Sequence, residues 1–164
     1  MAKFILTSTD FSDGGTIADA QVFNSFGFKG GNVSPELAWS GAPAGTRSFA
    51  LMVHDPDAPT GSGWWHWVMY NIPGNTTALA RGAGDPGKNL LPAGALQGRN
   101  DYGTFGYGGP APPPGPQHHY HFRLYALSVD KLDVPADASA ALIGFNVRAQ
   151  PLGEALLTGM YGRK

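Results

Sequence analysis

Glycine and proline interrupt this chain at short intervals, and this feature most limits the folds that it can adopt. The sequence holds 24 glycines and 14 prolines among 164 residues, and they fall between short apolar runs rather than in one tract. Such spacing is typical of turns that join strands. Four runs rich in β-branched and aromatic residues, each bounded by turn-forming residues, are predicted to be strands: residues 3–8, 47–54, 66–72 and 120–129.

Helical signal is confined to the C-terminal third. Asp137 is a candidate N-cap for a helix over residues 138–145, and a second apolar segment with helical character follows Pro151. The proline-rich residues 109–116 are interpreted as a rigid surface loop, because strand-like sequence resumes directly after them. The length predicts about one domain, so residues 1–164 are expected to form a single, mainly β domain.

The charge balance argues against several classes of partner. Only 14% of the residues are charged and the formal net charge is −1, so no nucleic acid partner is expected. The absence of cysteine excludes disulfides, thiolate metal sites and cysteine nucleophiles. The apolar run at the N-terminus is too short for a signal peptide, and no segment approaches membrane-spanning length. We therefore expect a soluble, cytoplasmic protein with no integral membrane segment.

Residues 54–66 hold the densest group of titratable and conformationally restricted residues in the chain. Asp55 and Asp57 alternate with prolines, which restrict the backbone and favour extended conformations before them. The glycines that follow allow a turn that can return Trp64 and His66 toward the two acids. Aromatic rings beside clustered Asp and His suit a small polar pocket. The alternative is a structural loop whose acids cap turns.

Two other motifs carry less weight. Residues 82–88 satisfy a glycine-rich phosphate-binding pattern, but Asn89 stands where Ser or Thr would hold the metal, and Pro86 interrupts the following helix. Alternation along a strand would place His119 and His121 on one face and His118 on the other. An exposed polar strand face is therefore favoured over a metal site, and no metal or other cofactor is expected.

Four motifs in this order resemble the phosphatidylethanolamine-binding protein family, in particular its bacterial Raf-kinase-inhibitor-like branch. They are Asp55-Pro56-Asp57-Ala58-Pro59, Trp64-Trp65-His66-Trp67, Gly108-Gly109-Pro110-Ala111-Pro112-Pro113 and His118-His119-Tyr120-x-Phe122. Residues 32–39, 96–101 and 157–163 extend the likeness over almost the whole chain. The resemblance implies a large central antiparallel sheet, a smaller flanking sheet and short C-terminal helices.

The resemblance also implies a small anion pocket at one edge of the fold. Carried over to this sequence, its ligand contacts would be Asp55, His66, His118 and Tyr120, with Trp64 as a wall, Ala111, Pro112 and Pro113 as a rim, and Asp57 and Pro59 in support. Members of the family bind phosphate-bearing head groups, and some inhibit kinases or serine proteases by docking on them. A phosphate-containing small molecule or lipid head group is the implied ligand, and a kinase or protease is the implied macromolecular target.

Three further expectations bear on mechanism and assembly. An Asp–His pair can also serve as acid–base machinery, so a hydrolase using Asp55 and His118 is the alternative to a non-catalytic binding protein. The Ala58–Pro59 peptide bond is predicted to be cis, as in many sharp rigid turns. Dimers are common in the bacterial branch, and a homodimer could use an apolar patch formed by Phe23, Phe26 and Phe28.

Overall fold

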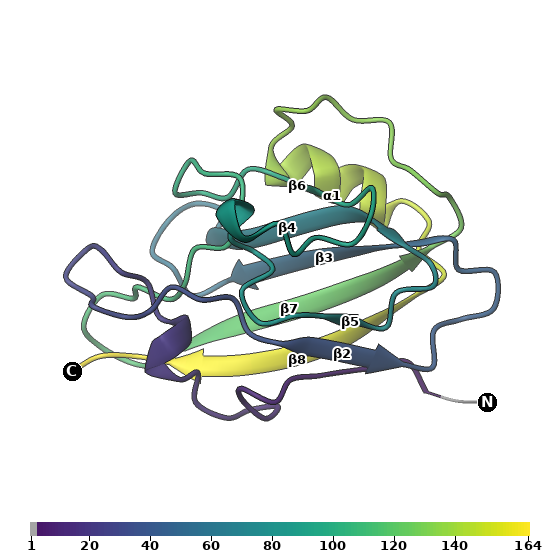
Figure 1. The fold of residues 1–164 in the computed structure, drawn as a ribbon. Coiled ribbons are helices and arrows are strands. Elements are labelled where there is room, and N and C mark those ends of the chain that lie inside the picture. Colours follow the sequence, from purple (N-terminus) through teal and green to yellow (C-terminus); the bar gives the residue numbers. More distant parts are fainter. Residues whose placement is uncertain (1–2) are drawn as a thin grey trace.

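Two antiparallel sheets make up most of the regular structure in the computed structural model, which describes residues 3–164 (Figure 1). The larger sheet has the strand order β6-β4-β3-β7-β8, and the smaller one has the order β1-β2-β5. In chain order the strands are β1 (Ile5–Thr7), β2 (Leu37–Ser40), β3 (Ser48–Asp55), β4 (Trp64–Pro73), β5 (Ala78–Leu79), β6 (Leu96–Gln97), β7 (His118–Leu127) and β8 (Gly153–Tyr161). The predicted mainly β fold, with a large central sheet and a smaller flanking sheet, is confirmed.

Apolar side chains cover both faces of the larger sheet. In the central strand β3, Leu51 and Val53 belong to the core shared with the smaller sheet, while Ala50 and Met52 pack in a second core with helix α1 (Ala140–Arg148). Neighbouring residues of a strand point to opposite faces, so a strand covered on both sides needs a continuous apolar run. Residues 49–53 supply that run, and all of them are buried.

The segment after Pro151 is a strand, not the predicted second helix. β8 pairs with β7 over nine residues, and Ala155 and Leu157 are buried while Glu154 and Leu156 are exposed. This period of two is the pattern of a strand with one covered face. The C-terminal region therefore contains one α-helix and one long edge strand.

The predicted N-cap of α1 is also wrong by two residues. The helix begins at Ala140, and the Ser139 hydroxyl accepts a hydrogen bond from the Leu142 amide at 3.1 Å. Asp137 lies too early to cap this turn, and its carbonyl instead accepts a bond from the Arg99 guanidinium at 2.8 Å. Both Ser and Asp are good caps, so local sequence does not distinguish them.

The loop between β3 and β4 turns without a cis peptide bond. Every peptide bond described between residues 3 and 164 is trans, so the predicted cis Ala58–Pro59 bond is wrong. The reversal is instead spread over residues 56–63. The Thr60 amide donates to the Ala58 carbonyl at 2.7 Å, and Gly63 adopts a left-handed φ of 71°. A glycine in this conformation completes the turn with little strain.

Short helices complete the fold. The 3₁₀ helices are η1 (Asp19–Gln21) and η2 (Pro86–Lys88), and η2 occupies the glycine-rich motif, where the Asp85 carboxylate accepts a bond from the Gly87 amide at 2.9 Å. A phosphate-binding loop requires a long helix at this point, and these residues form only a capped turn. Within residues 3–164, no helix has the length and apolar character needed to cross a bilayer.

Candidate functional site

The polar residues singled out from the sequence gather where three strands of the larger sheet begin or end. Asp55 is the last residue of β3, and its register partner Trp64 is the first residue of β4. His118 begins β7, which runs antiparallel to β3 on its other side. The strand ends therefore bring together side chains that are 63 residues apart in sequence.

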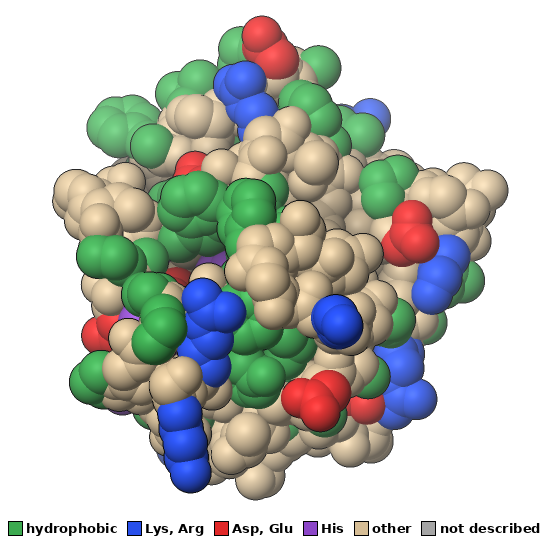
Figure 2. Space-filling model, turned by 90° about the vertical axis from the view of Figure 1, so that its left-hand side faces the viewer, with side chains coloured by type: hydrophobic (Ala, Val, Ile, Leu, Met, Phe, Trp, Pro, Cys, Tyr) green, Lys and Arg blue, Asp and Glu red, His purple; other side chains and the backbone are tan. Residues whose placement is uncertain are grey.

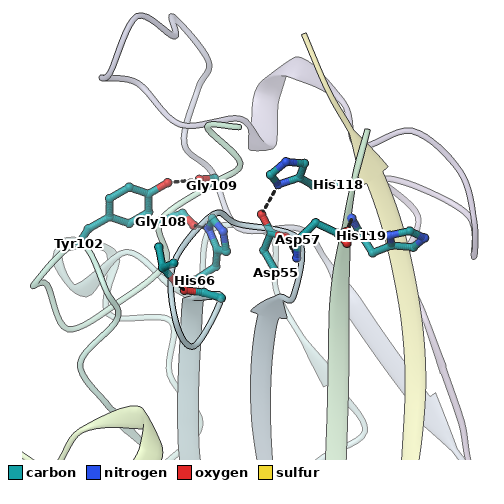
Figure 3. Close-up of polar contacts among 10 residues, drawn as sticks. Asp55, Asp57, His66, Tyr102, Gly108, Gly109, His118 and His119 are labelled. Carbon is teal, nitrogen blue, oxygen red and sulfur yellow. Dashed lines mark hydrogen bonds and ion pairs between the residues drawn. The ribbon is translucent and has the colours of Figure 1, made fainter. Parts of the chain in front are cut away.

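Asp55 and His118 form a buried hydrogen-bonded pair. His118 Nδ1 donates to Asp55 Oδ2 at 2.7 Å, and the two residues are 8% and 3% exposed, respectively. The other carboxylate oxygen, Oδ1, accepts from the Asp57 amide at 2.8 Å, so the turn after β3 holds the carboxylate from behind. Figure 3 shows the pair between the ends of the strands. With Nδ1 engaged, Nε2 is the imidazole atom that remains for a ligand.

His66 enters the site from β4 as a neutral ring. Burial lowers its pKa to about 4, against the opposing influence of the Gly108 carbonyl and the Asp55 carboxylate. At neutral pH its Nδ1–H therefore donates to the Gly108 carbonyl at 2.7 Å, and Nε2 keeps its lone pair. This bond also ties the glycine-rich start of the proline loop to the sheet (Figure 3).

Two buried polar groups at the site lack hydrogen-bond partners. The Trp64 indole N–H makes no hydrogen bond to any of residues 3–164, and the Tyr120 hydroxyl makes none of regular geometry, although the Asp55 carboxylate lies within its reach. Burial raises the pKa of Tyr120, and the nearby Asp55 carboxylate adds to the rise, so the hydroxyl stays protonated. A buried donor without an acceptor is costly, and such groups often mark a place that a ligand or water fills.

These residues line one cavity of about 240 Å³. Its lining comprises Phe26, Asp55, Ala58, Pro59, Thr60, Trp64, His66, Tyr102, Ala111, Pro112, Pro113, His118 and Tyr120. The expected convergence of Asp55, His66, His118 and Tyr120 is therefore seen in the geometry, while their role as ligand contacts stays a prediction. No Lys or Arg is among the lining residues, so the cavity contains one carboxylate and only imidazoles to oppose it.

Asp57 and His119 form a second pair that faces away from the cavity. Asp57 Oδ2 accepts from the His119 amide at 2.7 Å and from His119 Nδ1 at 2.8 Å, and both side chains are partly exposed. Figure 3 shows His118 and His119 on either side of β7, as the alternation of a strand requires. Asp57 therefore contacts the Asp55 carboxylate through its backbone amide, while its own carboxylate faces away from the cavity.

The other histidine of the motif lies on the outer face as well. His119 and His121 stack with ring centroids 5.8 Å apart, and His121 Nδ1 bonds the Thr158 hydroxyl at 2.9 Å. In the part of the chain that the structure describes, no group of three or more His, Cys, Asp or Glu side chains is arranged to hold a metal.

Sequence reasoning missed two aromatic residues of the cavity, Tyr102 and Phe26. The Tyr102 hydroxyl donates to the Gly109 carbonyl at 2.7 Å, and its ring meets those of Trp64 and His66 edge to face. Tyr102 directly follows the Asn100-Asp101 pair, and that motif is the signal that could have found it. Phe26 comes from the loop after η1, and no local motif marks it.

Of the three phenylalanines expected to form one apolar patch, Phe23 and Phe26 are in contact, with ring centroids 5.4 Å apart, whereas Phe28 packs against Tyr161. Phe23 stacks on Tyr102 with centroids 4.0 Å apart, and the Arg163 guanidinium lies over the Phe28 ring at 4.5 Å. Of the three, only Phe26 is largely exposed.

Comparisons with known proteins agree with this geometry. The sequence profile described as phosphatidylethanolamine-binding protein matches residues 7–162. Two Escherichia coli relatives are 48% identical: the UPF0098 protein YbcL over 98% of this chain and 88% of its own, and the UPF0098 protein YbhB over 95% and 98%. The crystal structure of YbcL, described as a new member of the mammalian PEBP family, superposes with a TM-score of 0.96 and covers 99% of this chain and all of its own.

Proposed function

Because the chain belongs to the phosphatidylethanolamine-binding protein family, we propose that it is a non-catalytic binding protein whose cavity holds the phosphate-bearing group of a small molecule or lipid head group. The observation that carries the proposal is the cavity itself, in which buried donors without acceptors lie beside a histidine that retains one free nitrogen. Phosphate oxygens are acceptors and satisfy such donors.

The charges of the lining residues limit the form of the ligand. Asp55 brings one negative charge, His66 is neutral, and no Lys or Arg lines the cavity to balance the carboxylate. A fully ionised phosphate would meet net repulsion in this cavity. The proposed ligand therefore carries a proton of its own, or a proton is taken up when it binds.

The hydrolase alternative is less well supported by the same residues. The hydroxyls that line the cavity are Thr60 and two tyrosines, and burial raises the pKa of both Tyr102 and Tyr120. Thr60 directs its hydroxyl to the Gly63 carbonyl. An acid–base pair without an activated nucleophile or a metal-bound water lacks half of a hydrolytic site, although water could still be the nucleophile.

Titration calorimetry with inorganic phosphate and phosphoethanolamine tests the proposal. His118→Ala should abolish most of the binding, because it removes the cavity donor and the partner of Asp55. The matched control is His119→Ala, which deletes a histidine in the same kind of Asp–His pair on the outer face and should bind like the wild type. Equal affinities for the two variants would place the ligand elsewhere, and turnover of phosphoesters or peptides would favour the hydrolase.

Docking on a kinase or protease, a homodimer and a cytoplasmic location belong to the same proposal as implications of the family. Pull-down from the host with the wild type and the His118→Ala variant would test docking on a kinase or protease. A target that binds at the cavity mouth should be released from the wild type by phosphoethanolamine. Native mass spectrometry of the purified protein would report subunit number and any retained ligand together.

A further inference from the structure

The mouth of the cavity carries an exposed aromatic ring that the phosphate proposal does not use. Phe26 is 63% exposed and yet lines the cavity. Its backbone is left-handed, with a φ of 57°, a conformation that is unusual for a bulky residue. Strained residues of this kind concentrate at ligand-binding sites, where the surrounding structure holds them in place.

Phe26 is the outer end of a continuous aromatic surface, here called the aromatic wall and formed by Phe26, Tyr102 and Trp64. The Phe26 and Tyr102 ring centroids are 5.6 Å apart, and those of Tyr102 and Trp64 are 5.2 Å apart. Phe23 stacks behind Tyr102, and the Tyr102 hydroxyl is anchored to the Gly109 carbonyl. The wall is therefore supported from behind and can receive a ligand without rearrangement.

The inner end of the cavity is more polar than its mouth. Asp55, His66, His118 and Tyr120 are all buried. The exposed lining residues are Phe26, Pro59, Pro113 and Thr60, whose hydroxyl is already bonded to the Gly63 carbonyl. Figure 2 shows this end of the molecule, where acidic and histidine side chains are partly visible in a hollow bordered by hydrophobic side chains. A ligand that fills the whole cavity must be anionic at its inner end and apolar at its outer end.

We infer that the aromatic wall is a second subsite, which takes a planar apolar group attached directly to the anion held by the inner residues. The inference rests on the proposed function and narrows it: the ligand class is an aryl or similarly planar phosphate monoester. Phe26 is the residue that determines specificity, because the ring packs on it in an edge-to-face or offset-stacked arrangement. A head group with a short polar chain would leave the wall uncovered.

Competition calorimetry with three probes tests this subsite: inorganic phosphate, phosphoethanolamine and phenyl phosphate. The wild type should bind phenyl phosphate most tightly. Phe26→Ala should weaken phenyl phosphate by about fivefold while leaving inorganic phosphate unchanged. Phe26→Tyr keeps the ring and should retain the preference. Phe145→Ala is the matched control, because Phe145 is 76% exposed on α1 and does not line the cavity.

The possible results separate this inference from the proposed function. If the wild type prefers phosphoethanolamine, or binds phenyl phosphate no better than inorganic phosphate, the aromatic subsite is refuted while the anion site stands. The same holds if Phe26→Ala loses affinity equally for all three probes or for none. If none of the probes binds to the wild type, the proposed anion site fails and the subsite fails with it.

Discussion

Asp55 Oδ2 and His118 Nδ1 lie 2.7 Å apart in the interior of the protein, although 63 residues separate them in the chain. The contact exists because β3 ends where β7 begins, on adjacent strands of one antiparallel sheet. Asp55 is the carboxylate of the cavity, and its charge and the turn that holds it affect both ligand binding and stability.

Binding of phosphoethanolamine should be accompanied by proton uptake. With no Lys or Arg among the lining residues, a proton taken up together with the anion should offset the Asp55 charge. Phosphate monoesters lose their second proton near about pH 6, so affinity should weaken as the pH rises above that value. Calorimetry at about pH 7.5 in buffers with different ionisation enthalpies should show uptake of about one proton per phosphate. No dependence on the buffer would contradict this charge balance.

Replacing Asp55 by Asn should keep the fold and remove the proton uptake that accompanies anion binding. The Asn oxygen can still accept from the Asp57 amide, but its amide group would donate to His118 Nδ1 and force the proton onto Nε2. The variant cavity then holds no carboxylate, and the neutral ring donates from Nε2, so phosphate can bind without an added proton and its affinity should depend less on pH than in the wild type. Nitrogen NMR spectroscopy of the imidazole should show the change of tautomer. An unchanged tautomer with an unchanged pH dependence of affinity would remove Asp55 from the mechanism.

Protonation of His66 should make the protein less stable in mild acid. Its folded-state pKa of about 4 lies below the value of about 6.5 expected in the unfolded chain, so the unfolded state takes up the proton first as the pH falls. The stability that the neutral ring contributes is present above about pH 6.5 and is lost progressively as the pH falls toward 4, by up to roughly 3 kcal/mol.

The matched variant for this effect is His66→Asn, which can still donate to the Gly108 carbonyl but does not titrate. The packing lost with the buried ring does not depend on pH, but the variant also lacks the His66 titration that destabilises the wild type in acid. Urea denaturation of both proteins across this pH range should therefore give curves that converge as the pH falls. Parallel curves would mean that His66 is not held neutral by burial.

The turn between β3 and β4 should tolerate a methyl group at Gly61 but not at Gly63. Gly63 has a left-handed φ, and a Cβ there would lie 2.5 Å from the Asp55 carbonyl oxygen, whereas a Cβ at Gly61 meets nothing within 4 Å. Gly63→Ala should lower the free energy of unfolding by at least about 2 kcal/mol, while Gly61→Ala should be nearly neutral. Thermal denaturation of the two variants would test this. Similar stabilities would show that the turn can rearrange, and phosphate binding would then report whether Asp55 moves with it.

The polarity pattern of the chain was sufficient to predict the core strands. Alternation correctly placed His119 and His121 on one face of β7 and His118 on the other, and the apolar run in β3 matches a strand covered on both sides. These predictions succeed because side-chain direction in a strand is a local property with a period of two. The segment after Pro151 failed, because its apolar composition suits a helix as well as a strand and only pairing with β7 selects the strand.

Local sequence and resemblance together identified the polar residues of the candidate site before any geometry was known. Asp55, His66 and His118 stand in motifs whose composition already suggests a pocket, and the resemblance supplied their grouping. The neutrality of His66, however, comes from its complete burial against the Gly108 carbonyl, and the absence of a cation from the cavity depends on which loops line it. Both properties depend on several groups that are distant in sequence and meet only in the folded protein.

The sequence by itself determined which chemical groups were available and which strands would carry them, because motif order and strand periodicity depend only on residues that are close together in the chain. Only the tertiary structure decided that Phe26 and Tyr102 join the cavity, that Asp57 turns away from it and that the loop closes with a trans bond. The physical reason is that strand ends, loop packing and burial depend on contacts between segments far apart in the chain, and such contacts set the charge and shape of a site without leaving a local pattern.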